Sequence, residues 1–369
     1  MTRQTLTGTT LCWILTALFT TPLCAGSETL QLNEQEYFES RGVNLLVFSN
    51  WYNGLFDDSK ISGIELIHHG VRTATNGDVR LHATPEQWDA IPEFVERTVD
   101  PENGAVEAAL RYPKFEFDYS IRVRATGDSV QITVHLPAPL PAALEGRAGL
   151  NLEFLPAAYF GKSFMTAEQT GLFPLYPTGP KERDGLTAPV PLATGKQLTL
   201  APGDPQRRVV IQSPDTDLAL YDGRSKAQNG WFVVRSLLPA GRKGEVLTWT
   251  LTANGVDDWV RPPVVAHSQV GYHPSQKKVA VIEQDPNDTA EGTAEVYRLS
   301  ANGAAEKVFS SAPQPWGRYK RYNYLTFDFS QVRDQGLYTI HYAGRQSSPF
   351  RIADEVYRGI WHPTLDIFF

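Results

Sequence analysis

Cysteine is almost absent from this chain: among 369 residues there are two, Cys12 and Cys24. Both lie within the first 25 residues, so residues 26–369 contain none. This absence excludes a disulfide framework, a cysteine nucleophile and a thiolate metal site from the main part of the chain. Without disulfides, the core alone must stabilise the fold, which favours large β-domains over a small stapled protein.

An excess of positive charge is also lacking. The chain has 34 basic and 41 acidic residues, a net charge of −7 and a pI near 5.7. This balance argues against a nucleic-acid footprint and against a basic membrane-binding surface. Apolar residues at 41% and charged residues at 20% are typical of globular proteins. The length is sufficient for two or three domains, each with its own core.

Long hydrophobic runs are missing as well. The most apolar segment, LCWILTALF at 11–19, is too short for a transmembrane helix. It follows Arg3 and precedes PLCA at 22–25, which is the layout of a secretory signal peptide. Lipoprotein processing at Cys24 is disfavoured by the bulky residue before it. We therefore predict a signal peptide over 1–25, no membrane span, and a secreted or periplasmic protein. Cleavage removes one Arg and leaves 33 basic and 41 acidic residues, a net charge of −8.

Past residue 26 the patterns are mostly those of β-strands. FVERTVDPENGAVEAALRY at 94–112 predicts a hairpin that turns at Asn103–Gly104. Alternating residues at 115–136 predict a second hairpin around Gly127, and one local helix is predicted at 84–91. We therefore predict that residues 26–260 form a large antiparallel β-sandwich domain.

A domain boundary is predicted near WVRPPVVAHS at 259–268, where two prolines separate β-rich blocks. Several short strands between 264 and 353, separated by turn residues, predict a small immunoglobulin-like β-sandwich. In DQGLYTI at 334–340, a Tyr follows a turn Gly, and its hydroxyl is expected to bond back across the sandwich corner.

The segment 354–369 has a different pattern. EVYRGIWHPTLDIFF carries an apolar stripe at helical spacing, with Asp354 as a possible N-cap and Pro363 positioned to open a second helical segment. The predicted fold class is therefore all-β: a large antiparallel β-sandwich, a small immunoglobulin-like β-sandwich, and a C-terminal helical stub.

Motifs of common catalytic and metal sites are missing. The sequence has no GxSxG elbow, Walker loop, GxGxxG fingerprint or HExxH pair. His68–His69 is the strongest candidate for a pair of metal ligands. Adjacent side chains on a strand point to opposite faces, however, so one ion could not easily bind both. DPND at 285–288 is predicted to be a turn, with too few oxygen ligands for Ca²⁺. We predict no catalytic residues, no metal site and no cofactor.

Aromatic residues in turn-rich contexts are the remaining indication of binding. NWYNGLF at 50–56 and PWGRYKRYNY at 315–324 suggest Trp51, Tyr52 and Trp316 as speculative carbohydrate contacts, because flat rings pack well on sugar C–H groups. The alternative is that these rings pack in the core or between domains. Basic residues interleave the second stretch, but the net charge of −8 argues against nucleic acid.

HSQVGYHPSQKKVAVIE at 267–283 resembles the opening strand of the immunoglobulin-like domain that precedes the catalytic module in many family 9 glycoside hydrolases, the cellulase and endoglucanase relatives. The closing strands of that domain resemble residues 324–352, and residues 44–81 resemble an extra N-terminal β-domain of some members. Ser268 stands where the family usually has Asn. Within the segment 267–283, the residues that match the family are Gln269, Gly271, Tyr272 and Pro274, followed by a lysine pair and an apolar strand.

This resemblance implies a longer enzyme. In the family a barrel of paired helices follows the sandwich and performs inverting hydrolysis with an Asp pair and a Glu, all of which would lie beyond Phe369. Residues 354–369 are then the first helix of a truncated catalytic domain. The implied partners are that missing domain and a polysaccharide, β-glucan or related. The residues expected to pack between domains are Tyr272, Trp361, Leu365, Phe368 and Phe369.

Two alternatives remain at this stage. The chain is a stand-alone carbohydrate-binding or scaffold protein, or it is a complete hydrolase with an unfamiliar site in 28–258. The sequence singles out no carboxylate pair for the second of these.

Overall fold

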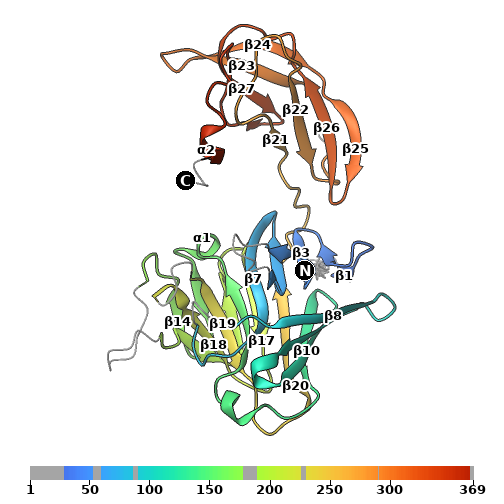
Figure 1. The fold of residues 1–369 in the computed structure, drawn as a ribbon, viewed down its shortest axis with the longest axis vertical. Coiled ribbons are helices and arrows are strands. Elements are labelled where there is room, and N and C mark those ends of the chain that lie inside the picture. The colour runs from blue at the N-terminus through green and yellow to red at the C-terminus, as the bar shows by residue number, and fades with distance from the viewer. Residues whose placement is uncertain are drawn as a thin grey trace, which may run out of the picture.

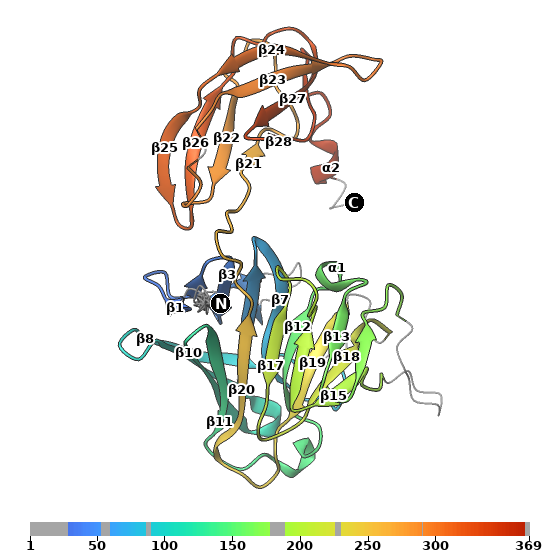
Figure 2. The ribbon, with the colours of Figure 1, turned by 180° about the vertical axis from the view of Figure 1, so that it is seen from behind.

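The computed structural model describes residues 29–52, 60–85, 90–177, 189–225, 230–289 and 291–365. Figure 1 shows two β-domains, one above the other, joined by an extended segment, and Figure 2 shows them from behind. The predicted all-β class is confirmed. The predicted signal peptide and residues 86–89 of the predicted helix at 84–91 lie outside the described residues.

The larger domain contains two sheets, each of nine strands among the described residues, with antiparallel pairing throughout. The first has the order β1 (Gln31–Leu32), β2 (Phe38–Ser40), β3 (Val43–Val47), β6 (Ile64–His68), β7 (Val71–Arg80), β12 (Gly149–Phe154), β19 (Phe232–Leu237), β18 (Leu218–Asp222) and β15 (Ala193–Gly195). The second has the order β14 (Thr170–Leu172), β13 (Ser163–Met165), β16 (Gln197–Leu200), β17 (Val209–Gln212), β20 (Gly244–Ala253), β11 (Ser129–Leu136), β10 (Phe117–Thr126), β9 (Ala105–Tyr112) and β8 (Glu93–Asp100). A separate ribbon pairs β4 (Trp51–Tyr52) with β5 (Lys60–Ile61).

Both predicted hairpins of this domain are confirmed. β8 pairs with β9 around the Asn103–Gly104 turn, where Gly104 has a φ of +57° that few other residues adopt readily. β10 pairs with β11 up to Thr126 and Ser129, which leaves a two-residue turn. Alternate residues of these strands point inward, and the apolar side chains of both sheets form one core that runs from Leu30 to Ala253. Short helical segments are α1 (Pro156–Tyr159) and 3₁₀ turns at Pro113–Phe115, Ala142–Leu144 and Gly223–Ser225.

The smaller domain is a sandwich of two further antiparallel sheets. One has the order β21 (Val264–Ala266), β22 (Val279–Gln284), β26 (Tyr322–Asp328) and β25 (Gln314–Tyr319). The other has the order β24 (Ala305–Ser311), β23 (Ala294–Leu299), β27 (Gly336–Tyr342) and β28 (Arg345–Gln346), with β29 (Phe350–Ile352) also paired to β27. Its core is a separate cluster that extends from Tyr272 to Ile352.

The predicted tyrosine corner is present in this sandwich. The Tyr338 hydroxyl donates a hydrogen bond of 2.7 Å to the carbonyl oxygen of Asp334, and the ring is buried against Phe350. This bond ties the loop before β27 to the strand itself.

We expect Tyr338→Phe to lower the unfolding free energy of the smaller domain by about 0.5–1.5 kcal/mol, because the hydrogen bond from the hydroxyl of the buried Tyr338 ring to Asp334 is lost. Thermal and urea unfolding of the whole chain would measure this. Tyr319→Phe removes an exposed hydroxyl from β25 of the same domain and serves as the control. Equal stabilities of the two variants would contradict a structural role for the corner.

The segment after the sandwich is less helical than its apolar stripe predicts. Residues 354–361 form successive turns, and helix α2 spans only His362–Leu365. The helix expected to begin at Asp354 does not form there, since Gly359 has a φ of +73°, which interrupts right-handed helical geometry. No helix among the described residues is long and apolar enough to cross a membrane.

Candidate functional site

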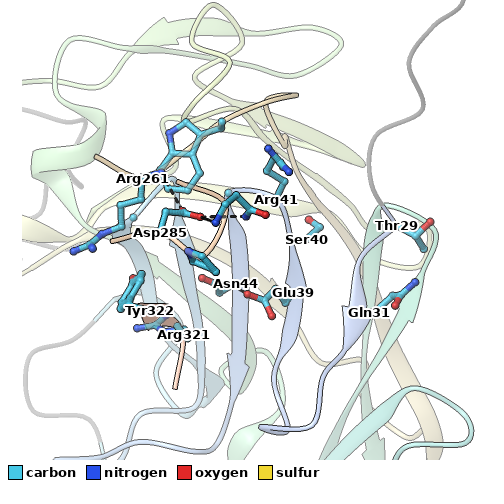
Figure 3. Close-up of a pocket in the computed structure, with 15 residues that line it drawn as sticks. Thr29, Gln31, Glu39, Ser40, Arg41, Asn44, Arg261, Asp285, Arg321 and Tyr322 are labelled. Carbon is cyan, nitrogen blue, oxygen red and sulfur yellow. Dashed lines mark hydrogen bonds between the residues drawn. The ribbon is translucent and has the colours of Figure 1, made fainter. Parts of the chain in front are cut away.

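A cavity of about 480 Å³ lies at the junction of the two domains. Figure 3 shows side chains of both domains and of the connecting segment around it. The larger domain contributes Thr29, Gln31, Glu39, Ser40, Arg41, Gly42, Asn44 and Gly70; the connection contributes Trp259 and Arg261; the smaller domain contributes Asp285, Pro286, Asn287, Arg321 and Tyr322. The lining is mostly polar, so it offers hydrogen-bonding groups to a hydrophilic ligand.

The wall from the larger domain is built by the β2–β3 hairpin. Glu39 and Asn44 are cross-strand partners, and the Asn44 amide donates to the Glu39 carboxylate at 3.4 Å. Asn33 donates to the other oxygen of Glu39 at 2.9 Å. Gly42 in the turn has a φ of +75°, and a Cβ there would lie 2.6 Å from the His69 ring. Only glycine therefore allows this turn to pack on the histidine.

His68 and His69 hold the start of the inter-domain connection. His68 Nε2 lies 2.8 Å from the Asn254 carbonyl oxygen, and His69 Nε2 accepts the Val256 N–H at 3.3 Å. The Trp259 ring meets the His69 ring edge-on at 5.1 Å. Side chains at the end of β6 thus position the aromatic residue that lines the pocket.

The expectation that His68 and His69 point to opposite faces is wrong. Their rings lie 4.6 Å apart, because the strand ends at His68 and His69 has a φ of +49° that departs from strand geometry. Burial lowers the pKa of His68 to about 4 and also lowers the pKa of His69. Within the described residues no third His, Cys, Asp or Glu joins them in a metal-binding group.

The wall from the smaller domain is organised around Asp285. Its carboxylate accepts the Arg261 N–H at 3.0 Å and both the backbone N–H and the side-chain amide of Asn287. The Asp288 N–H bonds to the Asp285 carbonyl oxygen, so the predicted turn at 285–288 is confirmed. Arg261 forms an ion pair of 2.7 Å with Glu283, and its guanidinium lies 4.4 Å from the centre of the Tyr322 ring.

Arg321 enters the pocket from the tip of the β25–β26 hairpin. Tyr319 pairs with Tyr322, so Lys320 and Arg321 form a two-residue turn, and Lys320 has the positive φ of such a turn. Arg321 Nη1 is buried and has no hydrogen-bond partner among the residues that the structure describes. Burial raises the pKa of Tyr37, and the Arg321 guanidinium opposes that rise. The charge of Arg321 therefore acts across the domain junction.

This arrangement suits binding better than catalysis. Both carboxylates of the pocket, Glu39 and Asp285, already accept hydrogen bonds from amide groups. The remaining groups are amides, hydroxyls, guanidiniums and two aromatic rings, which orient a polar ligand but supply no nucleophile with an adjacent base.

The residues suggested as carbohydrate contacts lie elsewhere. Trp51 on β4 is 56% exposed and meets Phe94 edge-on, and Trp316 on β25 is 64% exposed and meets Tyr324 edge-on. They belong to different domains, and neither lines the pocket. The side chain of Tyr52 lies outside the described residues.

The residues expected to pack between domains do not lie together in one interface. Tyr272 is buried in the core of the smaller sandwich, where its hydroxyl accepts the Ser268 N–H and donates to the Val279 carbonyl oxygen. Trp361 and Leu365 are exposed. Phe368 and Phe369 lie outside the described residues.

Sequence reasoning missed the pocket residues Trp259, Arg261 and Arg321. A signal was present, since the first two directly precede the prolines of the predicted boundary and the third lies in the aromatic stretch at 315–324. An aromatic and a cationic residue beside a domain linker are candidates for a junction site.

Comparison with known proteins identifies the smaller domain. Residues 261–347 match the model of the cellulase N-terminal ig-like domain, which confirms the resemblance over this part of the chain. No curated protein matches the chain. Solved structures with a local likeness include a metagenome-derived glycoside hydrolase family 9 endoglucanase, 23% identical over 26% of this chain and 19% of that chain, with a TM-score of 0.22. A Bacteroides ovatus GH9 structure is 24% identical over 28% of this chain and 18% of that one, with a TM-score of 0.24. The chain thus spans about a fifth of each of these structures.

Proposed function

We propose that this chain, which carries a cellulase-type N-terminal immunoglobulin-like domain, is the non-catalytic N-terminal part of an exported family 9-like glycoside hydrolase. The match of residues 261–347 carries this proposal. The smaller sandwich supports and positions a catalytic domain that follows it, and the whole enzyme hydrolyses β-glucan or a related polysaccharide. The predicted signal peptide at 1–25 directs export.

Exposed apolar side chains after the sandwich support this role. Ile360, Trp361 and Leu365 are exposed on the segment that follows β29, with Trp361 at 57%. Large apolar side chains grouped in one short segment are typical of a surface that another domain covers. In both views this segment lies on the opposite side of the smaller domain from β25, so a domain docked on it leaves β25 accessible (Figures 1 and 2).

The test is the size and activity of the native protein. An antibody against residues 28–258 would detect and capture it from the source culture. We expect a species clearly larger than 41.1 kDa that releases reducing sugar from β-glucan, whereas the 369-residue chain alone releases none. A native species at or below 41.1 kDa would instead favour a stand-alone carbohydrate-binding or scaffold protein.

Glycan contact is the second part of the proposal. Trp51, Tyr52 and Trp316 stack on pyranose rings and hold the enzyme on its polymer. Replacing all three with Ala is expected to reduce retention of the chain on insoluble β-glucan at least about tenfold, since stacking contacts contribute roughly 1 kcal/mol or more each. A pull-down on the washed polymer measures retention. Trp361→Ala, which removes another exposed indole, is the matched control; unchanged retention of the triple variant would refute these contacts.

A further inference from the structure

We infer that the junction pocket is a binding site for an acidic saccharide, with Arg321 as the residue that pairs with a uronic-acid carboxylate. The pocket volume of about 480 Å³ lies within the usual range for small-ligand sites, roughly 300–1,000 Å³. This site is distinct from the exposed Trp51 and Trp316, and it is contained entirely in the present chain.

The charges of the lining groups favour an anion. Three arginines and two carboxylates surround the cavity. Asp285 accepts hydrogen bonds from the backbone N–H of Arg261 and from Asn287, and Glu39 accepts them from two side-chain amides, so the acceptor oxygens of both carboxylates are already used within the protein. Arg261 is paired with Glu283 outside the cavity. Arg321, on the turn of the β25–β26 hairpin, supplies the guanidinium that the anion would meet.

Arg321 has a hydrogen-bond donor that the described residues of the protein leave unused. One nitrogen of its guanidinium is buried without an acceptor among the described residues. A buried N–H group without an acceptor is costly, and a carboxylate that accepts two parallel bonds from the guanidinium fork relieves that cost. The two-residue turn fixes the backbone position from which the Arg321 side chain reaches the pocket lining.

The other lining groups favour a sugar over an inorganic anion. Asn44 and Asn287 supply amides, Thr29 and Ser40 supply hydroxyls, and Trp259 supplies apolar ring surface. Hydroxyl-rich rings need this combination of hydrogen-bonding groups and aromatic surface. A bare phosphate would use the charge alone and leave the other groups without partners.

The experiment is isothermal titration calorimetry of the 369-residue chain with three probes: a uronic-acid tetrasaccharide, cellotetraose as its neutral counterpart, and inorganic phosphate. We expect the uronate to bind at least about tenfold more tightly than either other probe and to bind more weakly as salt is raised. Arg321→Gln should weaken uronate binding about tenfold or more, and Arg321→Lys, which keeps the charge but loses the fork, should have an intermediate effect.

Lys320→Asn is the matched control, because it removes one positive charge from the same turn and Asn tolerates the positive φ of that position. It should bind uronate like the parent chain. Equal melting temperatures of all variants show that each is folded. The proposal is overturned if the uronate does not bind at millimolar concentrations, if cellotetraose or phosphate binds equally well, or if Arg321→Gln and Lys320→Asn have the same affinity.

Discussion

Lowering the pH from about 7 to about 4.5 is expected to reduce the unfolding free energy of the larger domain by about 2–3 kcal/mol through His68 alone. His68 is fully buried at the end of β6, and burial lowers its pKa from 6.5 to about 4. In the unfolded chain it titrates near the ordinary value. Between these two pKa values the unfolded state binds a proton that the folded state does not bind.

The sign of the effect follows from this difference in bound protons. Above about pH 6.5 neither state holds the proton and the full stability is present. As the pH falls toward 4, protonation favours the unfolded chain and stability is lost. After burial, the hydrogen bond to the Asn254 carbonyl oxygen favours protonation of His68, and the neighbouring charges act less strongly: those of His69 and Arg207 oppose protonation, and that of Asp204 favours it. His69 adds to the loss, because a protonated Nε2 would face the Val256 N–H.

Urea unfolding of the parent chain and of His68→Gln at both pH values isolates this contribution. Gln keeps an N–H donor for the Asn254 carbonyl oxygen but does not titrate. The difference in stability between the two proteins should therefore shift in favour of the variant by about 2–3 kcal/mol on acidification. Parallel pH dependences of the two proteins would contradict the assignment to His68.

Local patterns predicted the parts of the fold that are determined locally. The Asn103–Gly104 turn and the alternation around Gly127 predict two hairpins, and both form. The register of the first hairpin is not given by that turn, because Asp100 pairs with Ala105 across a loop of four residues. The Tyr338 corner was likewise visible from a Gly and a Tyr at close spacing.

Predictions from sequence periodicity were wrong where the backbone departs from regular strand or helix geometry. A continuous strand through His68–His69 predicts rings on opposite faces, whereas a positive φ at His69 brings the rings together. The apolar stripe after Asp354 predicts a continuous helix, whereas Gly359 interrupts it. In the second case the signal was present, since Gly is a poor residue for a helix interior.

The junction pocket was not predictable from spacing. Its residues come from 29–44, 70, 259–261, 285–287 and 321–322, so it exists only when the two domains are placed together. Strand periodicity reports which face of a strand is buried and carries no information about contacts between domains. The burial of a charged residue could not be predicted either. An Arg in an apolar strand gives the same sequence pattern whether its side chain faces solvent or protein.

The most destabilising single change is expected at such a residue, Arg235 on β19, which is only 2% exposed. Its guanidinium donates to Asn151 Oδ1 at 2.9 Å and to the carbonyl oxygens of His82 and Arg147. These acceptors belong to β12 and to loops far apart in the sequence. One buried side chain on β19 therefore links β12 with the segments that follow β7 and precede β12.

Arg235→Met keeps the length and apolar stem of the side chain but removes its hydrogen bonds to Asn151, His82 and Arg147. We expect a loss of about 2–4 kcal/mol in unfolding free energy, because hydrogen bonds from a charged donor contribute about 1.5–3 kcal/mol each and are not fully additive. Arg235→Lys should lose less, because it keeps the charge but not the planar fork. Urea unfolding measures both. Arg124→Met, at an exposed position on β10, is the control and should change stability by less than about 0.5 kcal/mol. If the two Met variants proved equally stable, the carbonyl oxygens around Arg235 would have to be satisfied without it, and the link between these loops would not depend on the guanidinium.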